Sequence, residues 1–208
     1  EQIQIFKDFS TGKGGDLISF IMEVEGLDFK EAIHFIVQKY QLNIDISQLS
    51  NSQNNKSSKT LEINQLAADK YHLYLLKSPK AKKCLDYLIN QRKLSLETIK
   101  EFKLGCSPDS WDTLFQYLKS ENFNELDILE SNICIKGKNG KIFDFYRNRL
   151  MIPLFDQYGK IIGFSGRKID ENDYGPKYIN SRDGEYYKKS KYLYGLNFSK
   201  ADIKQSNE

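Results

Sequence analysis

Cysteine and histidine are scarce in this chain. Its 208 residues include three cysteines, Cys84, Cys106 and Cys134, and two histidines, His34 and His72. The cysteines are far apart and odd in number, and neither histidine has a cysteine or carboxylate at ligand spacing, so no disulfide framework or zinc cluster is indicated. We expect three free thiols and two histidines with structural roles.

Long apolar runs are also missing. No segment approaches the roughly 18 consecutive apolar residues that a membrane-spanning helix needs, and the first residues lack the basic and apolar regions of a signal peptide. Hydrophobic residues make up 39% of the chain and charged residues 28%, which is typical of a soluble globular protein. We therefore expect a cytoplasmic protein with no membrane partner.

The chain has little net charge, but that charge is unevenly distributed. The formal net charge is +3. Residues 135–195 contain 13 Lys and Arg against 7 Asp and Glu, so this part is basic and the remainder is slightly acidic. A basic region rich in tyrosine suits the phosphate backbone of a nucleic acid. Nucleic acid is therefore the first class of partner to consider.

The N-terminal part is predicted to form a helical hairpin. Apolar residues recur at spacings of three and four over residues 17–24 and 29–40, which is the pattern of two amphipathic helices. Gly26 lies between them as a helix stop, and Asp28 with Glu31 forms a capping-box pattern at the second start.

A polar segment follows the hairpin. Residues 47–60 have almost no apolar side chains and cannot bury enough surface to offset the entropy of ordering them. This composition predicts a flexible linker between a small module, residues 1–46, and a main domain, residues 61–208.

The main domain is predicted to be α+β. Helical spacing covers residues 61–76, 81–91, 96–102 and 111–118, the last with Ser110 as its expected N-cap. Strand-like segments then form two expected hairpins, over residues 133–145 and 150–164. A helical N-terminal half followed by a mostly antiparallel, strongly basic sheet subdomain is the expected fold.

Three arginines in the second half are candidate phosphate contacts. Arg147 and Arg149 lie two apart on an expected strand, which would place both side chains on one face. Arg167 follows Gly163 and Gly166, whose lack of side chains lets another chain approach closely. A guanidinium group can bind two phosphate oxygens at once.

The same arginines have an alternative interpretation. They could lie on a solvated strand face, or form structural ion pairs with Asp144 and Asp170. Composition alone slightly favours this alternative over nucleic-acid binding.

A second group of candidates lies in a loop after Gly175 and Pro176. Lys177, Tyr178 and Asn180 offer a cation, an aromatic ring and an amide within four residues, and Lys189 continues the positive charge. Such a mixture suits a single strand, because the cation can meet phosphate while the ring stacks on a base without reading its identity. For an isolated run of lysines, a solvated face is the alternative.

Four ordered segments resemble the polymerase domain of bacterial DnaG-type primases, the enzymes that make RNA primers. The segments are RNRLMIP (147–153), GFSGR (163–167), PKYINS (176–181) and KSKYLYGL (189–196). The resemblance implies a basic groove that guides the single-stranded DNA template and the nascent RNA–DNA hybrid. Its lining residues would be Arg147, Arg149, Arg167, Lys177, Tyr178, Asn180 and Lys189.

The resemblance also implies an activity and further partners. Primer synthesis in this family belongs to a Toprim domain, which holds Mg²⁺ or Mn²⁺ with a glutamate and an Asp-x-Asp pair. No Asp-x-Asp occurs in these 208 residues. We expect the intact protein to be a DNA-directed RNA polymerase, a nucleotidyltransferase that uses ribonucleotides and works with a replicative helicase. This chain alone, with no catalytic residue and no bound cofactor, is expected not to polymerise.

A function of another class remains open at this point. The chain could be a stand-alone single-stranded nucleic-acid-binding module without catalysis. The coding sequence that adjoins it would separate the two hypotheses.

The segment IFKDFSTGKGGDLISF (5–20) resembles the second half of the family's zinc-binding domain, in which two cysteines precede a glycine-rich turn. Asp8 and Thr11 occupy the two cysteine positions. One carboxylate and one hydroxyl cannot replace two thiolates, so we expect a degenerate module without zinc. Trp111 also matches a tryptophan of the family and is expected to pack.

Overall fold

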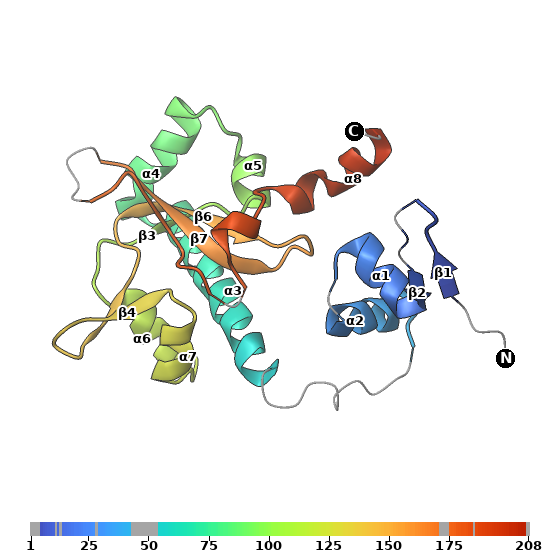
Figure 1. Cartoon of the computed structure of the whole chain (residues 1–208). Coiled ribbons are helices and arrows are strands. Elements are labelled where there is room, and N and C mark those ends of the chain that lie inside the picture. The colour runs from blue at the N-terminus through green and yellow to red at the C-terminus, as the bar shows by residue number, and fades with distance from the viewer. Residues whose placement is uncertain are drawn as a thin grey trace. The chain divides into compact units, whose positions relative to one another are not determined.

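The protein is described here by a computed structural model covering residues 5–10, 12, 14–27, 29–42, 54–170, 175–184 and 186–206 (Figure 1). The chain divides into two compact units, residues 1–54 and 55–208. Within the described ranges, no helix combines the length and the apolar character needed to cross a membrane.

The first unit is a short β-hairpin followed by two helices. Strands β1 (Ile5–Lys7) and β2 (Gly14–Asp16) pair antiparallel, and helices α1 (Leu17–Glu25) and α2 (Phe29–Lys39) follow. Both predicted helices are confirmed. The strands were not predicted, because three residues are too few for an alternating pattern to be recognised. The expected capping box at Asp28 lies outside the described residues.

Local chemistry sets both ends of α1. The Asp16 carboxylate accepts a hydrogen bond from the Ser19 amide at 2.8 Å, which caps the helix N-terminus. Gly26 ends the helix in the left-handed conformation, with a φ of 68°, as its position predicted. The small buried core of this unit consists of Ile21, Leu27 and Ala32.

Helix α3 (Asn54–Lys77) opens the second unit and begins earlier than the sequence predicts. Composition predicts a flexible linker over residues 47–60, and this prediction is wrong for residues 54–60, which are helical. Residues 47–53 lie outside the described residues. Once the apolar part of a helix has formed, each residue added to its end gains a hydrogen bond, so a polar segment can extend it.

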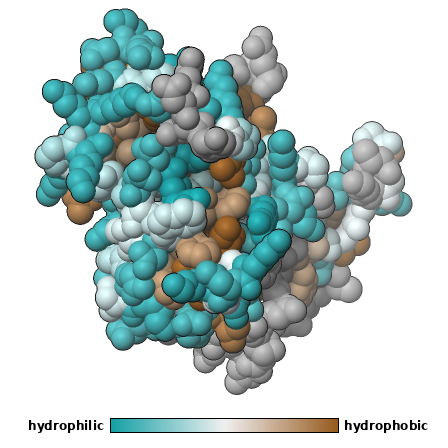
Figure 2. Space-filling view, turned by 90° about the vertical axis from the view of Figure 1, so that its left-hand side faces the viewer, coloured by the Kyte–Doolittle hydropathy of each residue, from teal (hydrophilic) through white to brown (hydrophobic). Residues whose placement is uncertain are grey.

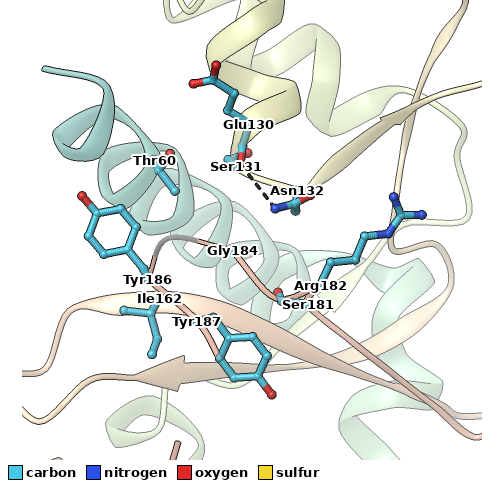
Figure 3. Close-up of a pocket in the computed structure, with 10 residues that line it drawn as sticks. All are labelled: Thr60, Glu130, Ser131, Asn132, Ile162, Ser181, Arg182, Gly184, Tyr186 and Tyr187. Atoms are coloured by element: carbon cyan, nitrogen blue, oxygen red, sulfur yellow. Dashed lines mark hydrogen bonds between the residues drawn. The ribbon is translucent and has the colours of Figure 1, made fainter. Parts of the chain in front are cut away.

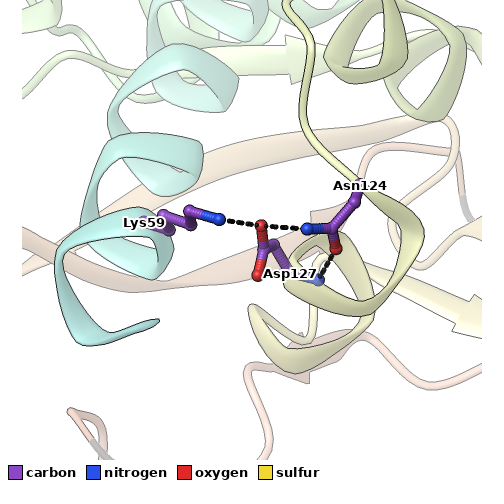
Figure 4. Close-up of polar contacts among 3 residues, drawn as sticks. All are labelled: Lys59, Asn124 and Asp127. Atoms are coloured by element: carbon purple, nitrogen blue, oxygen red, sulfur yellow. Dashed lines mark hydrogen bonds and ion pairs between the residues drawn. The ribbon is translucent and has the colours of Figure 1, made fainter. Parts of the chain in front are cut away.

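A polar contact far along the chain anchors this extension (Figure 4). The Lys59 ammonium lies 2.7 Å from Oδ2 of Asp127, which is buried on helix α7 (Glu125–Glu130). The Asn124 amide donates to the same oxygen at 2.7 Å, and its own oxygen accepts from the Asp127 amide at 2.8 Å. Nothing in the local sequence of the linker region reveals this partner.

The remaining helices are short. They are η2 (Pro79–Ala81), α4 (Lys82–Asp86), η3 (Tyr87–Gln91), α5 (Leu96–Glu101), α6 (Thr113–Ser120), η4 (Lys189–Lys191) and α8 (Leu196–Ser206). The helix predicted over residues 81–91 is thus divided into a 3₁₀ turn, an α-helical part and a π-helical part, η3. Ser95 caps α5 by accepting from the Thr98 amide, as its type favours.

The N-terminus of α6 is capped from a distant strand. Ser110 is the predicted N-cap, but the N-cap position falls on Asp112, whose side chain makes no capping bond. The buried Asp144 carboxylate instead accepts hydrogen bonds from the Leu114 and Phe115 amides at 2.8 and 2.9 Å. Burial raises the pKa of Asp144, and these two amide bonds act in the opposite direction.

Three antiparallel sheets are present in the described residues. The largest has the order β3 (Gly105–Ser107), β6 (Arg149–Phe155), β7 (Ile161–Lys168) and β8 (Tyr178–Asn180). Strands β4 (Cys134–Lys136) and β5 (Ile142–Asp144) form a separate hairpin, and β1 pairs with β2. Both predicted hairpins of the main domain and the α+β class are therefore confirmed.

Helices cover both faces of the four-stranded sheet (Figure 1). Met151 and Phe164 lie on one face and pack in a cluster with Tyr71 of α3 and with residues of α6. Leu150 and Ile152 lie on the other face, in a cluster with residues of α4, η3 and α5. Because successive residues of a strand point to opposite faces, β6 contributes to both clusters.

All three cysteines are free and buried, as predicted. Contact with Cys106, together with burial, raises the pKa of the Cys84 thiol, and burial raises that of Cys134. A thiol that stays protonated is a poor nucleophile, so these side chains act as small core residues.

We predict that Asp144→Ala destabilises the second unit by about 1–3 kcal/mol, because two buried amides lose their acceptor. Asp112→Ala is the matched control, since it removes a carboxylate at the same helix end that makes no capping bond. Its expected effect is within about 0.5 kcal/mol. Urea unfolding followed by circular dichroism measures both. Equal losses in the two variants would contradict the assignment of the cap to Asp144.

Candidate nucleic-acid interface

The pairing of β7 with β8 brings three predicted residues together. Arg167 lies opposite Tyr178, and Ser165 lies opposite Asn180. Directly opposed residues of an antiparallel pair share a face, and so do residues two apart on one strand. Arg167, Tyr178 and Asn180 therefore line one face of the sheet edge, which the sequence alone did not show.

The guanidinium group of Arg167 lies near two tyrosine rings. Its guanidinium carbon is 4.3 Å from the ring centroid of Tyr87 and 6.0 Å from that of Tyr178, and Nη1 donates to the Lys168 carbonyl at 2.9 Å. The Tyr87 ring is buried, whereas Tyr178 is 48% exposed. The stack holds the guanidinium in place and leaves an aromatic face open to solvent.

Tyr87 is a contributor that the sequence analysis missed. It is the first residue of the π-helical segment η3, a geometry that often occurs at functional sites. Eighty residues separate it from Arg167, so no local motif links them. The π-helical geometry of η3 singles out Tyr87 in the structure. This geometry cannot be recognised from the periodicity of the sequence.

The loop before β8 presents the candidate cation. Lys177 is exposed, and its carbonyl accepts a hydrogen bond from the Lys168 amide at 2.8 Å, which ties this end of the loop to β7. Lys189, at the start of η4, is also exposed, and its amide donates to the Asp183 carboxylate at 3.0 Å. The ammonium groups of both lysines are thus carried on backbone that hydrogen bonds hold in place.

Arg147 does not lie on a strand. It precedes β6, and the following residue, Asn148, has a φ of 50°, so the strand periodicity assumed for Arg147 and Arg149 does not apply. The Arg147 guanidinium carbon lies 3.4 Å from the ring centroid of Trp111. Trp111 packs edge to face against Phe143, as expected, but it does so at the surface, with 60% of the residue exposed.

Arg149 is buried, with 5% of its surface exposed. Its Nη1 donates to the carbonyls of Gly166 and Pro176, each at 3.1 Å. In the register of β6 with β7, Arg149 pairs with Lys168 and Leu150 pairs with Arg167, so Arg149 and Arg167 point to opposite faces. The prediction that Arg149 shares a binding face with Arg147 is wrong, and in this structure its guanidinium is not available to a phosphate.

Gly163 and Gly166 make room for the protein's own side chains. A Cβ at Gly163 would lie 2.8 Å from Oγ of Ser181, and one at Gly166 would lie 2.7 Å from the Tyr146 ring. The expectation that these glycines admit another chain is therefore incorrect, because the space beside them is already filled.

The two aspartates considered as ion-pair partners of the arginines contact other groups. Asp170 forms an ion pair with Lys83, and Asp144 accepts from the amides of α6. Arg147 and Arg167 stack on aromatic rings. These contacts favour cation–aromatic stacking over the arginine–carboxylate pairs that composition suggested.

The side of the molecule that carries the labels α4, β3 and β4 in Figure 1 faces the viewer in Figure 2. This side is mainly hydrophilic, and hydrophobic residues gather in its middle (Figure 2).

A cavity of about 260 Å³ opens beside the segment that follows β8 (Figure 3). It lies between Thr60 of α3, Asn132 after α7 and Gly184. Arg182 also belongs to its rim, and the guanidinium of this residue lies over the Phe145 ring, 5.3 Å from the centroid. The cavity lining is mostly neutral and polar, unlike the cationic loop at Lys177.

Of the two positions at which the family resemblance leads us to expect cysteines, only Asp8 is among the described residues. The Asp8 carboxylate accepts hydrogen bonds from the amide and hydroxyl of Ser10, at 2.8 and 2.7 Å. Thr11 lies outside the described residues. In the described part of the chain, no three His, Cys, Asp or Glu side chains gather in a way that could hold a metal ion.

Two family models match this chain. The DNA primase catalytic core, N-terminal domain, matches residues 71–200, and the CHC2 zinc finger matches residues 1–52. The chain therefore belongs to the DnaG-type DNA primase family, as its four segments indicated. The first model covers most of the second unit, including every candidate residue discussed above.

Individual relatives agree with this assignment. The DNA primase of Clostridium acetobutylicum is 37% identical over 94% of this chain and 32% of its own length. The structure of Aquifex aeolicus primase, comprising zinc-binding and RNA polymerase domains, has a TM-score of 0.64 at 32% identity, covering 98% of this chain and 47% of that one. A DnaG primase catalytic domain bound to single-stranded DNA has a TM-score of 0.66 at 27% identity, covering 72% and 47%. The chain spans about a third of the length of the curated relatives it matches.

Proposed function

We propose that this chain is the template-guiding part of a DNA primase, an enzyme that synthesises short RNA primers on single-stranded DNA for replication. Family membership supports the activity of the whole protein, and a relative has been solved with single-stranded DNA bound. The single observation that carries the proposal for this chain is the Tyr87–Arg167–Tyr178 stack beside the exposed Lys177.

The geometry suits a strand whose sequence is not read. An exposed ring such as that of Tyr178 can stack on any base, while the Lys177 ammonium meets a backbone phosphate. The Trp111–Arg147 stack offers a second exposed ring backed by a cation. Asn180 and Lys189 are the other proposed contacts. Arg149 is not proposed as a direct contact, because it is buried.

Catalysis is assigned to other parts of the protein. A primase needs divalent metal ions, Mg²⁺ or Mn²⁺, held by carboxylates such as an Asp-x-Asp pair, to bring the attacking hydroxyl and the incoming ribonucleotide together. The 208 residues contain no Asp-x-Asp. We infer that this chain binds template and RNA–DNA hybrid without polymerising, and that the intact cytoplasmic enzyme also meets ribonucleotides and a replicative helicase.

A stand-alone single-strand-binding module remains the second candidate, because the aromatic stack and the exposed Lys177 would serve binding without catalysis equally well. Primer synthesis by the protein from the complete gene, assayed on a single-stranded template with ribonucleotides and Mg²⁺, separates the two. Ribonucleotide incorporation supports the primase, and single-strand binding without incorporation supports the module.

We predict that the chain binds short single-stranded DNA with strong salt dependence. Lys177→Ala and Arg167→Ala are expected to weaken binding several-fold, and Lys177→Ala should lower the slope of log affinity against log salt by about 0.7. Lys119→Ala is the matched control, because it removes an exposed lysine from helix α6. Fluorescence anisotropy of a labelled oligonucleotide measures affinity, and Trp111, the single tryptophan, reports contact by quenching. Unchanged affinity in both variants would refute the interface.

We further propose that the zinc site of the family is lost, because Asp8 and Thr11 replace two thiolates. Metal analysis of the purified chain is expected to find much less than one zinc per molecule. The double variant Asp8→Cys/Thr11→Cys restores two thiolates and is expected to bind more zinc, which shows that the measurement can detect a gain. One zinc per wild-type chain that resists dialysis against a chelator would overturn the proposal.

A further inference from the structure

We propose that Arg149 is a positioning residue that fixes the loop carrying Lys177 and Tyr178 in its binding conformation. The inference rests on the proposed function, because it concerns how the same interface is organised. The residue types around Arg149 predicted a direct phosphate contact. Its burial and its partners assign it a different role.

Arg149 connects two parts of the backbone that no strand pairing joins. One Nη1 bond, of 3.1 Å, goes to Gly166 within β7, and the other, also of 3.1 Å, goes to Pro176 in the loop before β8. The two bonds from Nη1 thus hold the Pro176 carbonyl of the loop in a fixed position relative to the Gly166 carbonyl of the sheet. The rigid, planar guanidinium donates in fixed directions, whereas a lysine ammonium on a flexible stem does not hold two acceptors in a defined geometry.

Two glycines provide the space for this side chain. A Cβ at Gly166 would lie 3.1 Å from Cδ of Arg149, and one at Gly175 would lie 3.5 Å from Nη2. Gly175 also has a φ of 95°, a conformation that other residues rarely adopt. The arginine therefore passes close to the backbone of both glycines, and a side chain at Gly166 would crowd it.

The anchored carbonyl directly precedes the proposed contacts. Pro176 is followed by Lys177, whose carbonyl accepts from the Lys168 amide at 2.8 Å, and by Tyr178, which lies opposite Arg167. Without Arg149, the strand pairing would still hold Tyr178, but the Gly175–Pro176 turn would lose its anchor to β7. Binding would then have to order this turn, which lowers affinity.

The first test needs no DNA. Arg149→Lys keeps the positive charge and removes the planar donor group. We expect amide hydrogen exchange to become faster at Lys168, whose amide donates to the Lys177 carbonyl beside the anchored turn, while exchange of core amides in α6 stays unchanged. Arg92→Lys makes the same chemical change at an exposed arginine and should alter neither. Uniformly faster exchange, or no change at Lys168, would overturn the proposal. If Arg149→Lys does not fold, Arg149→Gln supplies an N–H donor without a buried charge and is judged by the same outcomes.

The second test measures binding of a labelled single-stranded oligonucleotide by Arg149→Lys, Lys177→Ala and the double variant. We expect Arg149→Lys to weaken binding about threefold to tenfold and to add little further loss in the Lys177→Ala background, since a positioning residue acts through the residue it places. Full additivity, or unchanged affinity in Arg149→Lys, would refute the positioning role. Failure of wild-type binding would instead refute the proposed function, and the exchange result would still stand.

Discussion

The register between β6 and β7 is the constraint on which the rest of the main unit depends. It pairs Leu150 with Arg167 and Arg149 with Lys168, and so decides which side chains enter each helical cluster. A shift by one residue would exchange the two faces and place Arg167 among core residues. The candidate interface exists because this register directs Arg167 toward Tyr87 and Tyr178, at the end of the strand.

Aromatic rings and backbone carbonyls contact three arginines of the main unit. Arg167 and Arg147 lie over rings, and Arg149 donates to two carbonyls. A cation held over a ring keeps its positive charge for a bound anion, whereas a carboxylate partner cancels part of that charge. Stacking is also compatible with a partner that brings its own flat groups, because a base can join a stack that already exists.

The first unit has a defined local structure on both sides of the glycine-rich segment. The β1–β2 pair and the Asp16 cap on α1 are present, and the expected cysteine position at residue 8 holds an aspartate. Its buried core is only Ile21, Leu27 and Ala32. Units of this size depend strongly on additional contacts for stability, since little apolar surface is buried.

Much of the secondary structure followed from the sequence by itself. The apolar spacing of α1, α2 and α3, the stop at Gly26 and both main-domain hairpins depend on residues within a few positions of each other. Four short segments identified the family. The tertiary structure alone decided the remainder. Four features join residues 17 or more positions apart: the Asp144 cap, the Lys59 anchor, the Tyr87–Arg167 stack and the hydrogen bonds of the buried Arg149. Neither hydrophobic periodicity nor a local motif indicates which distant residue a side chain will contact.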